Sequence, residues 1–174
     1  MNRRIFLLSG AAALGAAGTI YGTWQLLDSG RRNITGNARA GAFEITRTEA
    51  QWRAMLTEAQ FAVLRQEATE QPGSSPLNDE KRAGIYHCAG CDLPVYASDA
   101  KFDSGTGWPS FTEALPDAVR TKPDNSLFAT RTEVHCRRCG GHFGHIFDDG
   151  PEPTGKRHCL NGLALTFRPD NADA

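Results

Sequence analysis

The sequence predicts a mainly β domain of antiparallel strands preceded by short helices. Three observations lead to this class. From Gly84 onward, short apolar segments are separated by turn-forming residues, a pattern typical of strands. The 18 glycines and 9 prolines favour a turn-rich body over a helical bundle. Ahead of Gly84, two helix-start signals follow one another along the chain.

The first 40 residues form a segment distinct from this domain. Arg3 and Arg4 precede an apolar run over residues 5–27, as in export signals. Residues 2–8 resemble the twin-arginine export motif, in which two arginines are followed by any residue and then Phe-Leu. The run is close to the roughly 20 residues that span a bilayer, so an uncleaved anchor also stays open. We assign residues 1–40 to an export signal or membrane anchor plus linker, and residues 41–174 to the functional domain.

This assignment has a consequence for location. The domain is expected outside the cytoplasm, in the periplasm or cell envelope, with membrane contact only through the N-terminal segment if that segment is not cleaved.

Within the domain, each helix, loop and strand is predicted from a local pattern. A helix is predicted after Thr48, because Gln51 completes a capping box, and another after Thr57, where Gln60 repeats the signal. Residues 71–78 predict a loop. Strands are predicted at residues 85–87, 95–97, 127–136 and 163–168.

Four of the five cysteines form two Cys-x-x-Cys pairs, Cys88 with Cys91 and Cys136 with Cys139. This spacing lets both thiolates of a pair face one ion, so two pairs predict a tetrahedral structural zinc site. The pairs lie farther apart than the roughly 15–20 residues of a compact zinc ribbon, so the ion would join distant parts of one domain. Four sulfur ligands leave no open position for a catalytic water.

Other interpretations of these pairs stay open. A Cys-x-x-Cys can be a redox dithiol, although the thioredoxin-like βαβ pattern is absent here. Exported cysteines can also form disulfides. Zinc knuckles can bind nucleic acid, but a formal net charge of −1 gives no basic footprint, so no nucleic-acid partner is expected.

The fifth cysteine, Cys159, is left without a pair and is therefore a candidate reactive thiol. The alternative is a small buried side chain, which is common for a lone cysteine. On a strand, Arg157, Cys159 and Asn161 would share one face, while His158 would point away. His142 and His145 follow the second cysteine pair closely, and a metal site could hold them rigidly.

Several motifs, in order, resemble one known family, the zinc-containing methionine-R-sulfoxide reductases, MsrB. The resemblance runs from about Phe43 to Phe167. It is carried by the segments 84–91 (GIYHCAGC), 101–111 (KFDSGTGWPSF), 133–147 (EVHCRRCGGHFGHIF), 149–155 (DGPEPTG) and 157–161 (RHCLN).

The resemblance implies a fold of two antiparallel sheets with short N-terminal helices, termed β-tent or Mss4-like, and one four-cysteine zinc site. It implies that Cys159 attacks the sulfoxide sulfur and becomes a sulfenic acid. His145 would help to protonate the departing oxygen, and His142 and Asn161 would help to fix the sulfoxide. Trp108 would pack against the substrate methyl group, and Arg157 is taken as a second substrate-binding residue. The implied substrates are oxidised methionine-containing proteins, repaired after oxidative stress.

The sequence departs from this family's pattern at one position. Many members carry a resolving cysteine two residues before the tryptophan, where this chain has Thr106. If zinc holds four cysteines, sulfenic acid at Cys159 must be reduced by a thioredoxin-like or small-thiol partner. The alternative is a zinc-free Cys-x-x-Cys that resolves it. Two further hypotheses are a zinc-dependent binding module in which Cys159 is merely buried, and a chaperone for oxidised proteins that performs no chemistry.

Overall fold

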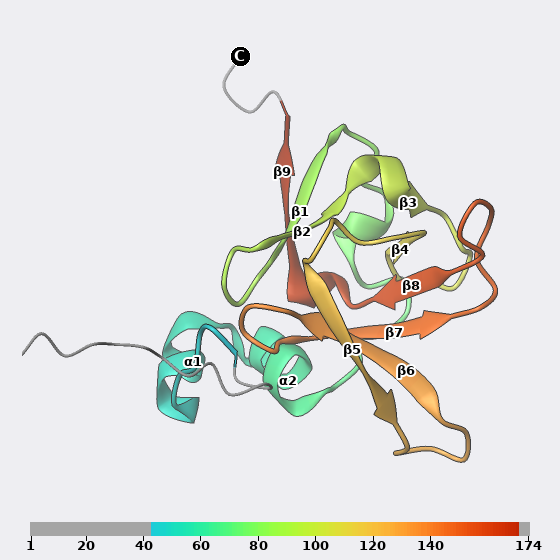
Figure 1. Ribbon diagram of the computed structural model, residues 1–174. Helices are drawn as coiled ribbons and strands as arrows, with labels where there is room; N and C mark the ends of the chain where they lie inside the picture. The colour runs from blue at the N-terminus through green and yellow to red at the C-terminus, as the bar shows by residue number, and fades with distance from the viewer. Residues whose placement is uncertain (1–42, 171–174) are drawn as a thin grey trace, which may run out of the picture. The chain divides into compact units, whose positions relative to one another are not determined.

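The computed structural model describes residues 43–170 (Figure 1). The expected export segment and linker therefore lie outside the described residues. Within the described range, no helix is both long and apolar enough to cross a membrane.

Two short helices open the described part of the chain. Helix α1 spans Glu49–Met55 and helix α2 spans Glu58–Gln66, and each begins with the predicted capping box, on Thr48 and Thr57. The apolar face of the pair is buried through Trp52, Phe61 and Leu64. Both predicted helices are thus confirmed.

A three-stranded antiparallel sheet has the order β2-β1-β9. Its strands are β1 (Gly84–Cys88), β2 (Pro94–Ala97) and β9 (Leu165–Pro169). A six-stranded antiparallel sheet has the order β3-β4-β8-β7-β6-β5. Its strands are β3 (Lys101–Phe102), β4 (Ser110–Phe111), β5 (Val119–Asp124), β6 (Arg131–Cys136), β7 (His142–Phe147) and β8 (Arg157–Leu160). Single turns of 3-10 helix are η1 (Pro76–Asn78), η2 (Ser98–Ala100) and η3 (Gly162–Ala164).

The mainly β class with two antiparallel sheets and short N-terminal helices is confirmed, but two predicted strand boundaries are wrong. The strand expected at 127–136 begins only at Arg131, because Asp124 and Asn125 close a hairpin turn with side-chain hydrogen bonds. The strand expected at 163–168 begins at Leu165, because residues 162–164 form η3. Strands β3, β4, β5, β7 and β8 were not predicted, since they are short or rich in polar residues and glycine.

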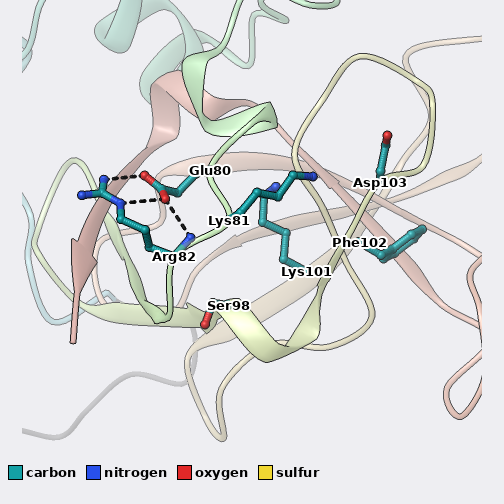
Figure 2. A pocket seen from close by; sticks show the side chains of 7 residues that line it. All are labelled: Glu80, Lys81, Arg82, Ser98, Lys101, Phe102 and Asp103. Carbon is teal, nitrogen blue, oxygen red and sulfur yellow. Dashed lines mark hydrogen bonds and ion pairs between the residues drawn. The ribbon is translucent and has the colours of Figure 1, made fainter. Parts of the chain in front are cut away.

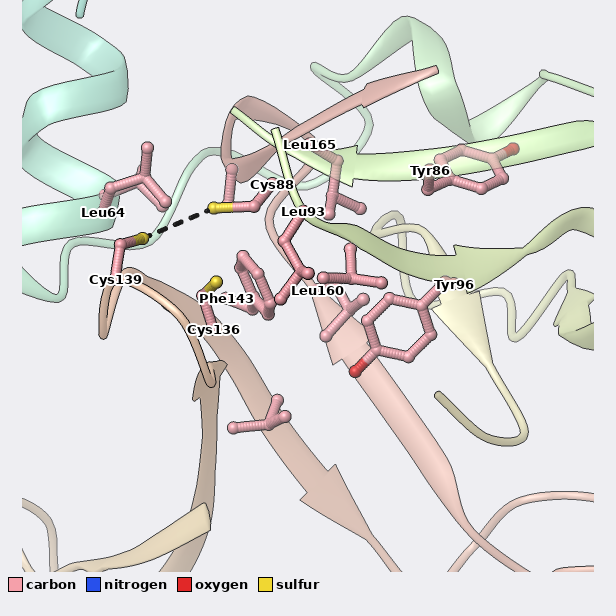
Figure 3. Packing of buried hydrophobic residues seen from close by; sticks show 14 of the residues in the cluster. Leu64, Tyr86, Cys88, Leu93, Tyr96, Cys136, Cys139, Phe143, Leu160 and Leu165 are labelled. Carbon is pink, nitrogen blue, oxygen red and sulfur yellow. Dashed lines mark hydrogen bonds between the residues drawn. The ribbon is translucent and has the colours of Figure 1, made fainter. Parts of the chain in front are cut away.

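Buried aromatic and aliphatic side chains from both sheets form one core (Figure 3). Tyr96 and Tyr86 pack on Phe111 with ring centroids 4.7 and 4.9 Å apart. Phe143 and Leu160 are fully buried on neighbouring strands β7 and β8. This packing holds the middle of the six-stranded sheet rigidly, and the candidate site lies on those two strands.

Candidate active site and metal centre

The four paired cysteines come together at the turns that follow β1 and β6. Their sulfur atoms all lie within 4.8 Å of one another. Cys88 Sγ lies 3.7 Å from Cys139 Sγ, and Cys91 Sγ lies 3.5 Å from Cys136 Sγ. These contacts join one Cys-x-x-Cys pair to the other, and they are far longer than the roughly 2.05 Å of a disulfide. The cluster is therefore a group of free thiols that could hold one metal ion.

The surroundings of this cluster are built to hold its shape. Gly140 has φ +69°, and a Cβ there would meet the Phe43 ring at 2.3 Å, so only glycine suits this turn. Arg65 of α2 donates to the carbonyl of Cys139 at 3.0 Å. Leu64 lies beside Cys139 in Figure 3 and is fully buried. Helix α2 thus covers the turn that carries the second cysteine pair.

A separate cavity of about 210 Å³ opens over β7 and β8. It brings together four of the predicted site residues, Trp108, His145, Cys159 and Asn161. Its full lining is Thr69, Trp108, Arg131, Gly144, His145, Phe147, Cys159, Leu160 and Asn161. Phe147 lines the cavity, whereas Phe111 is fully buried in the core.

Cys159 sits in the middle of β8, paired with His145 on β7 and with Ser110 on β4. Strand β7 passes close to it because residue 144 is glycine; a Cβ at Gly144 would lie 2.0 Å from the Cys159 carbonyl oxygen. Burial raises the pKa of the Cys159 thiol, while the Arg157 charge and a hydrogen bond with Thr106 lower it. The Thr106 Oγ1–Cys159 Sγ distance is 4.0 Å. Burial is the largest of these effects, so the pKa of the Cys159 thiol lies above its ordinary value.

Thr106, at the position where a resolving cysteine is expected, therefore lies directly beside the Cys159 sulfur. Thr106 is fixed there by a chain of hydroxyl contacts: Ser104 Oγ lies 2.8 Å from Thr106 Oγ1 and 2.7 Å from Ser110 Oγ. The loop that carries Thr106 is therefore anchored to β4, the strand next to Cys159.

His145 is held by a carboxylate that the sequence did not point to. Its Nε2 lies 2.7 Å from Asp124 Oδ2, and Arg131 donates to the same oxygen at 2.6 Å. Burial lowers the pKa of His145, and the hydrogen bond to Asp124 raises it. Asp124 ends β5 and Arg131 begins β6, so the β5–β6 hairpin orients the imidazole of His145.

His142 is placed behind His145 and does not line the cavity. It is buried, its ring lies edge-on to that of His145 with centroids 5.5 Å apart, and burial lowers its pKa. His142 Nδ1 lies 3.0 Å from Glu133 Oε1, and Lys122 pairs with Glu133 Oε2 at 2.8 Å. His142 Nε2 is buried with no hydrogen-bond partner among residues 43–170. Its ring supports His145 in this structure and does not reach the cavity.

Trp108 and Asn161 are tied together through Glu70, another residue that sequence reasoning missed. The indole Nε1 of Trp108 donates to the Glu70 carbonyl at 3.0 Å, and the Glu70 N–H donates to Asn161 Oδ1 at 2.9 Å. The buried carboxylate of Glu70 accepts the backbone N–H groups of Gly162 and Leu163. Glu70 lies in a loop without periodicity, between the polar residues Thr69 and Gln71, so no local signal in the sequence singled it out.

Arg157 and His158 flank Cys159 but are not among the residues that line the cavity. Arg157 forms two hydrogen bonds of 2.9 Å with Asp149 and lies 4.5 Å from the Phe147 ring centroid. Arg157 places a positive charge near the Cys159 thiol, but its side chain does not line the cavity. His158 points away, as its place on the strand predicts, and lies 3.0 Å from the Tyr96 hydroxyl. Burial lowers its pKa to about 4.

A second hollow, between η2 and β3, is polar (Figure 2). Glu80 and Arg82 pair with each other at its edge, and Lys81 and Lys101 lie next to one another. It contains neither cysteine nor histidine. Among the described residues, this hollow therefore contains none of the predicted site residues, which lie in the cysteine cluster or at and beside the Cys159 cavity.

The chain is similar to proteins of one known family. A family model described as the SelR domain matches residues 56–169. "Peptide methionine sulfoxide reductase MsrB" of Leifsonia xyli subsp. xyli is 48% identical over 137 residues, which cover 78% of this chain and 99% of the relative. The protein with the same name from Methanosarcina mazei is 51% identical over 125 residues, covering 71% and 89%.

A vertebrate relative aligns with nearly the whole chain. "Methionine-R-sulfoxide reductase B2, mitochondrial" of Danio rerio is 39% identical over 180 residues, covering 97% of this chain and 98% of the relative. Among solved structures, "Crystal Structure of Mis18 'Yippee-like' Domain" matches with a TM-score of 0.40 and 18% identity, over 50% of this chain and 96% of that one.

Proposed function

The chain belongs to the SelR domain family of peptide-methionine (R)-S-oxide reductases, and from this premise we propose that Cys159 is the nucleophile of its oxidoreductase reaction. The observation that carries the proposal is the shared cavity: the Cys159 thiol, the Asp124-held imidazole of His145 and the Trp108 ring all line it. A merely buried Cys159, as in a binding module, would have no such surroundings.

The chemistry transfers one oxygen atom and two electrons. The Cys159 sulfur forms a bond with the sulfoxide sulfur, and the S–O bond of the substrate breaks. The new S–S bond then breaks with its electron pair left on the methionine sulfur, and the oxygen ends on Cys159 as a sulfenic acid. The thiol proton accounts for the proton of that acid, so a thiol and a sulfoxide give a sulfenic acid and a thioether. A sulfoxide oxygen leaves only when it is protonated, and His145 holds and delivers that proton.

The remaining wall residues orient the substrate. The indole of Trp108 offers a rigid apolar surface for the methyl group on the sulfur. Asn161 is fixed by its bonds to Glu70 and to the Phe143 carbonyl, and a further N–H on its Nδ2 is available to the sulfoxide oxygen. Arg157 favours the thiolate of Cys159 electrostatically. His142 supports the ring of His145 and does not itself contact the sulfoxide, because it does not line the cavity.

Recycling requires a second molecule. Thr106 cannot form a disulfide with Cys159, and the other four thiols are gathered in the metal cluster. We infer that a thioredoxin-like or small-thiol reductant supplies two thiols, which become a disulfide while the sulfenic acid becomes thiol and water.

Zinc is the ion that best fits the cysteine cluster. A Zn–S bond of about 2.3 Å in a tetrahedron places sulfurs roughly 3.8 Å apart. The distances of 3.7 and 3.5 Å between Cys88 and Cys139 and between Cys91 and Cys136 are close to that value. When bound, the ion supplies a structural cross-link. The thiolates of Cys88, Cys91, Cys136 and Cys139 would hold it, the turn at Gly140 shapes their site, and none of the four lines the Cys159 cavity.

We also propose that the protein repairs oxidised proteins outside the cytoplasm, in the periplasm or cell envelope. The support is the arginine pair and apolar run of residues 1–40, which precede a domain over residues 41–174. Fractionation of cells expressing the full chain tests this. The double variant Arg3→Lys/Arg4→Lys is the control and is expected to stay in the cytoplasm, whereas wild-type protein found there would contradict the proposal.

Turnover by the purified protein tests the reaction itself. With dithiothreitol as reductant, the R epimer of N-acetyl-methionine sulfoxide is reduced and the S epimer is not. Cys159→Ser abolishes turnover, whereas Cys159→Ser with retained activity, or preference for the S epimer, contradicts the proposal. Mass spectrometry after one equivalent of sulfoxide, without reductant, is expected to show one added oxygen on Cys159.

A further inference from the structure

Two large apolar side chains stand uncovered at the tip of the β5–β6 hairpin. Leu127 is 59% exposed and Phe128 is 113% exposed. Met55, on helix α1, is the third large apolar side chain exposed within residues 43–170. Single exposed apolar residues are ordinary, but two neighbours at one tip contribute nothing to the packing of this domain and form a small apolar surface.

The base of this tip is fixed by side-chain hydrogen bonds. Asp124 Oδ1 accepts the Ser126 N–H at 2.9 Å, and Asn125 Oδ1 accepts the Thr130 hydroxyl at 2.8 Å. Neither Leu127 nor Phe128 takes part in these bonds through its side chain. The loop therefore presents both side chains to solvent from a defined base, and changing them leaves the base intact.

The tip is continuous with the wall of the active-site cavity. Asp124, at one end of the tip, contacts His145, and Arg131, at the other end, lines the cavity. Phe147 also lines the cavity, and the loop that follows it along the chain carries the charged residues Asp148, Asp149 and Lys156. Leu127 and Phe128 are therefore the exposed large apolar side chains of the segment that joins Asp124 to Arg131, both of which lie at the cavity.

The size of the cavity leaves the residues that flank a substrate methionine sulfoxide outside it. Its volume of about 210 Å³ is below the roughly 300–1,000 Å³ of pockets for drug-sized ligands. It accommodates the side chain of one methionine sulfoxide, and the residues before and after it must lie outside. Their contacts with the rim then add to the affinity for the polypeptide.

We propose that the hairpin tip, residues 125–130 with Leu127 and Phe128 at its centre, docks apolar residues that flank the methionine sulfoxide in a polypeptide substrate. The proposal rests on the proposed function and deepens it, since it names the substrate segments that the enzyme prefers. Oxidised methionines with leucine, valine or phenylalanine neighbours are reduced faster than those with serine or glycine neighbours.

The test compares three substrates carrying the R epimer: a short peptide with leucine neighbours, the same peptide with serine neighbours, and N-acetyl-methionine sulfoxide amide. The Leu127→Ser/Phe128→Ser variant is expected to lose roughly tenfold in kcat/KM on the leucine peptide, mainly through a higher KM, because apolar burial is lost. Its activity on the other two substrates stays within about twofold of wild type. Met55→Ser, an exposed apolar residue on α1, is the matched control and changes none of the three.

Three results would overturn the proposal. Equal losses on all three substrates would mean that the tip only supports the hairpin base, and no loss on any would mean that it has no role. Unchanged peptide preference, together with weaker binding to anionic lipid vesicles or weaker self-association, would assign the tip to a membrane or to a second copy. If wild-type protein reduces none of the substrates, the proposed function itself fails, which is a separate outcome.

Discussion

Replacing Glu70 by glutamine is expected to damage stability and activity together. The two carboxylate oxygens of Glu70 accept the N–H groups of Gly162 and Leu163 inside the protein. In Glu70→Gln one oxygen becomes an NH₂ group, so one of these buried N–H groups faces a donor. Losing a hydrogen bond to a charged group and leaving a buried donor unpaired lowers the free energy of unfolding by about 2–4 kcal/mol.

That loss is large enough to measure in a domain of this size. At about 3–6 °C per kcal/mol, Tm falls by roughly 6–24 °C. The backbone of Glu70 also holds Trp108 Nε1 and Asn161 Oδ1, so a shift of this residue displaces two walls of the cavity. Because misplacement by about 1 Å can cost a hundredfold, we expect kcat/KM to fall at least tenfold.

The assay is urea unfolding followed by circular dichroism, with turnover of the R epimer measured on the same preparations and metal content checked in each. Glu67→Gln is the matched control, three residues earlier. Glu67 is exposed and pairs with Lys122 at 2.7 Å, so its loss costs at most about 1 kcal/mol and leaves turnover unchanged. Equal behaviour of the two variants, or a Glu70→Gln protein with wild-type stability and kcat/KM, would refute the reasoning.

Four further outcomes are expected. Asp124→Asn replaces the carboxylate that raises the pKa of His145 by a neutral amide. The acid-requiring limb of the kcat–pH profile therefore moves to lower pH and turnover at pH 7.5 falls, while Asp148→Asn, which removes an exposed charge, leaves the profile in place. The pKa of buried His158 is about 4 in the folded state and about 6.5 in the unfolded chain, so the unfolded chain binds the proton first as pH falls. The free energy of unfolding therefore decreases by about 2 kcal/mol between pH 7 and pH 5. His158→Gln removes this contribution to the pH dependence of stability, measured by urea unfolding. Metal removal with a strong chelator, or Cys88→Ser, abolishes cooperative unfolding at 37 °C, and a chelated protein with an unchanged Tm would argue against a structural ion. Thr106→Cys places a thiol next to Cys159, so one equivalent of sulfoxide yields an internal disulfide rather than a stable sulfenic acid, detected as two fewer free thiols and a mass loss of about 2 Da.

The sequence was sufficient for features that depend on local chemistry. Thr48 and Thr57 start helices because each has a glutamine three residues later, and the structure contains both capping boxes. The spacing of the cysteine pairs predicted a metal cluster, and the fold brings all four sulfurs together. Strand alternation correctly separated Cys159 and Asn161, which line the cavity, from His158, which does not.

Features that depend on distant residues could not be predicted in this way. The five unpredicted strands have two to six residues, and several are polar, so pairing with neighbours rather than their own composition makes them strands. His142 and Arg157 appeared equivalent to the other site residues in sequence, but their partners Glu133 and Asp149 direct them elsewhere. Neither partner is recognisable until the sheet is assembled.

The β5–β6 hairpin shows why such partners matter for function. Asp124 at the end of β5 holds His145, and Glu133 on β6 holds His142, so one hairpin sets the orientation of both histidines. Its two strands pair with each other in register from Val119 to Asp124, and a slip by one residue would move both carboxylates to the opposite face. The apolar tip lies between Asp124 and Arg131, both of which contact the site. A polypeptide docked on the tip, as proposed above, would therefore contact the hairpin that orients His145.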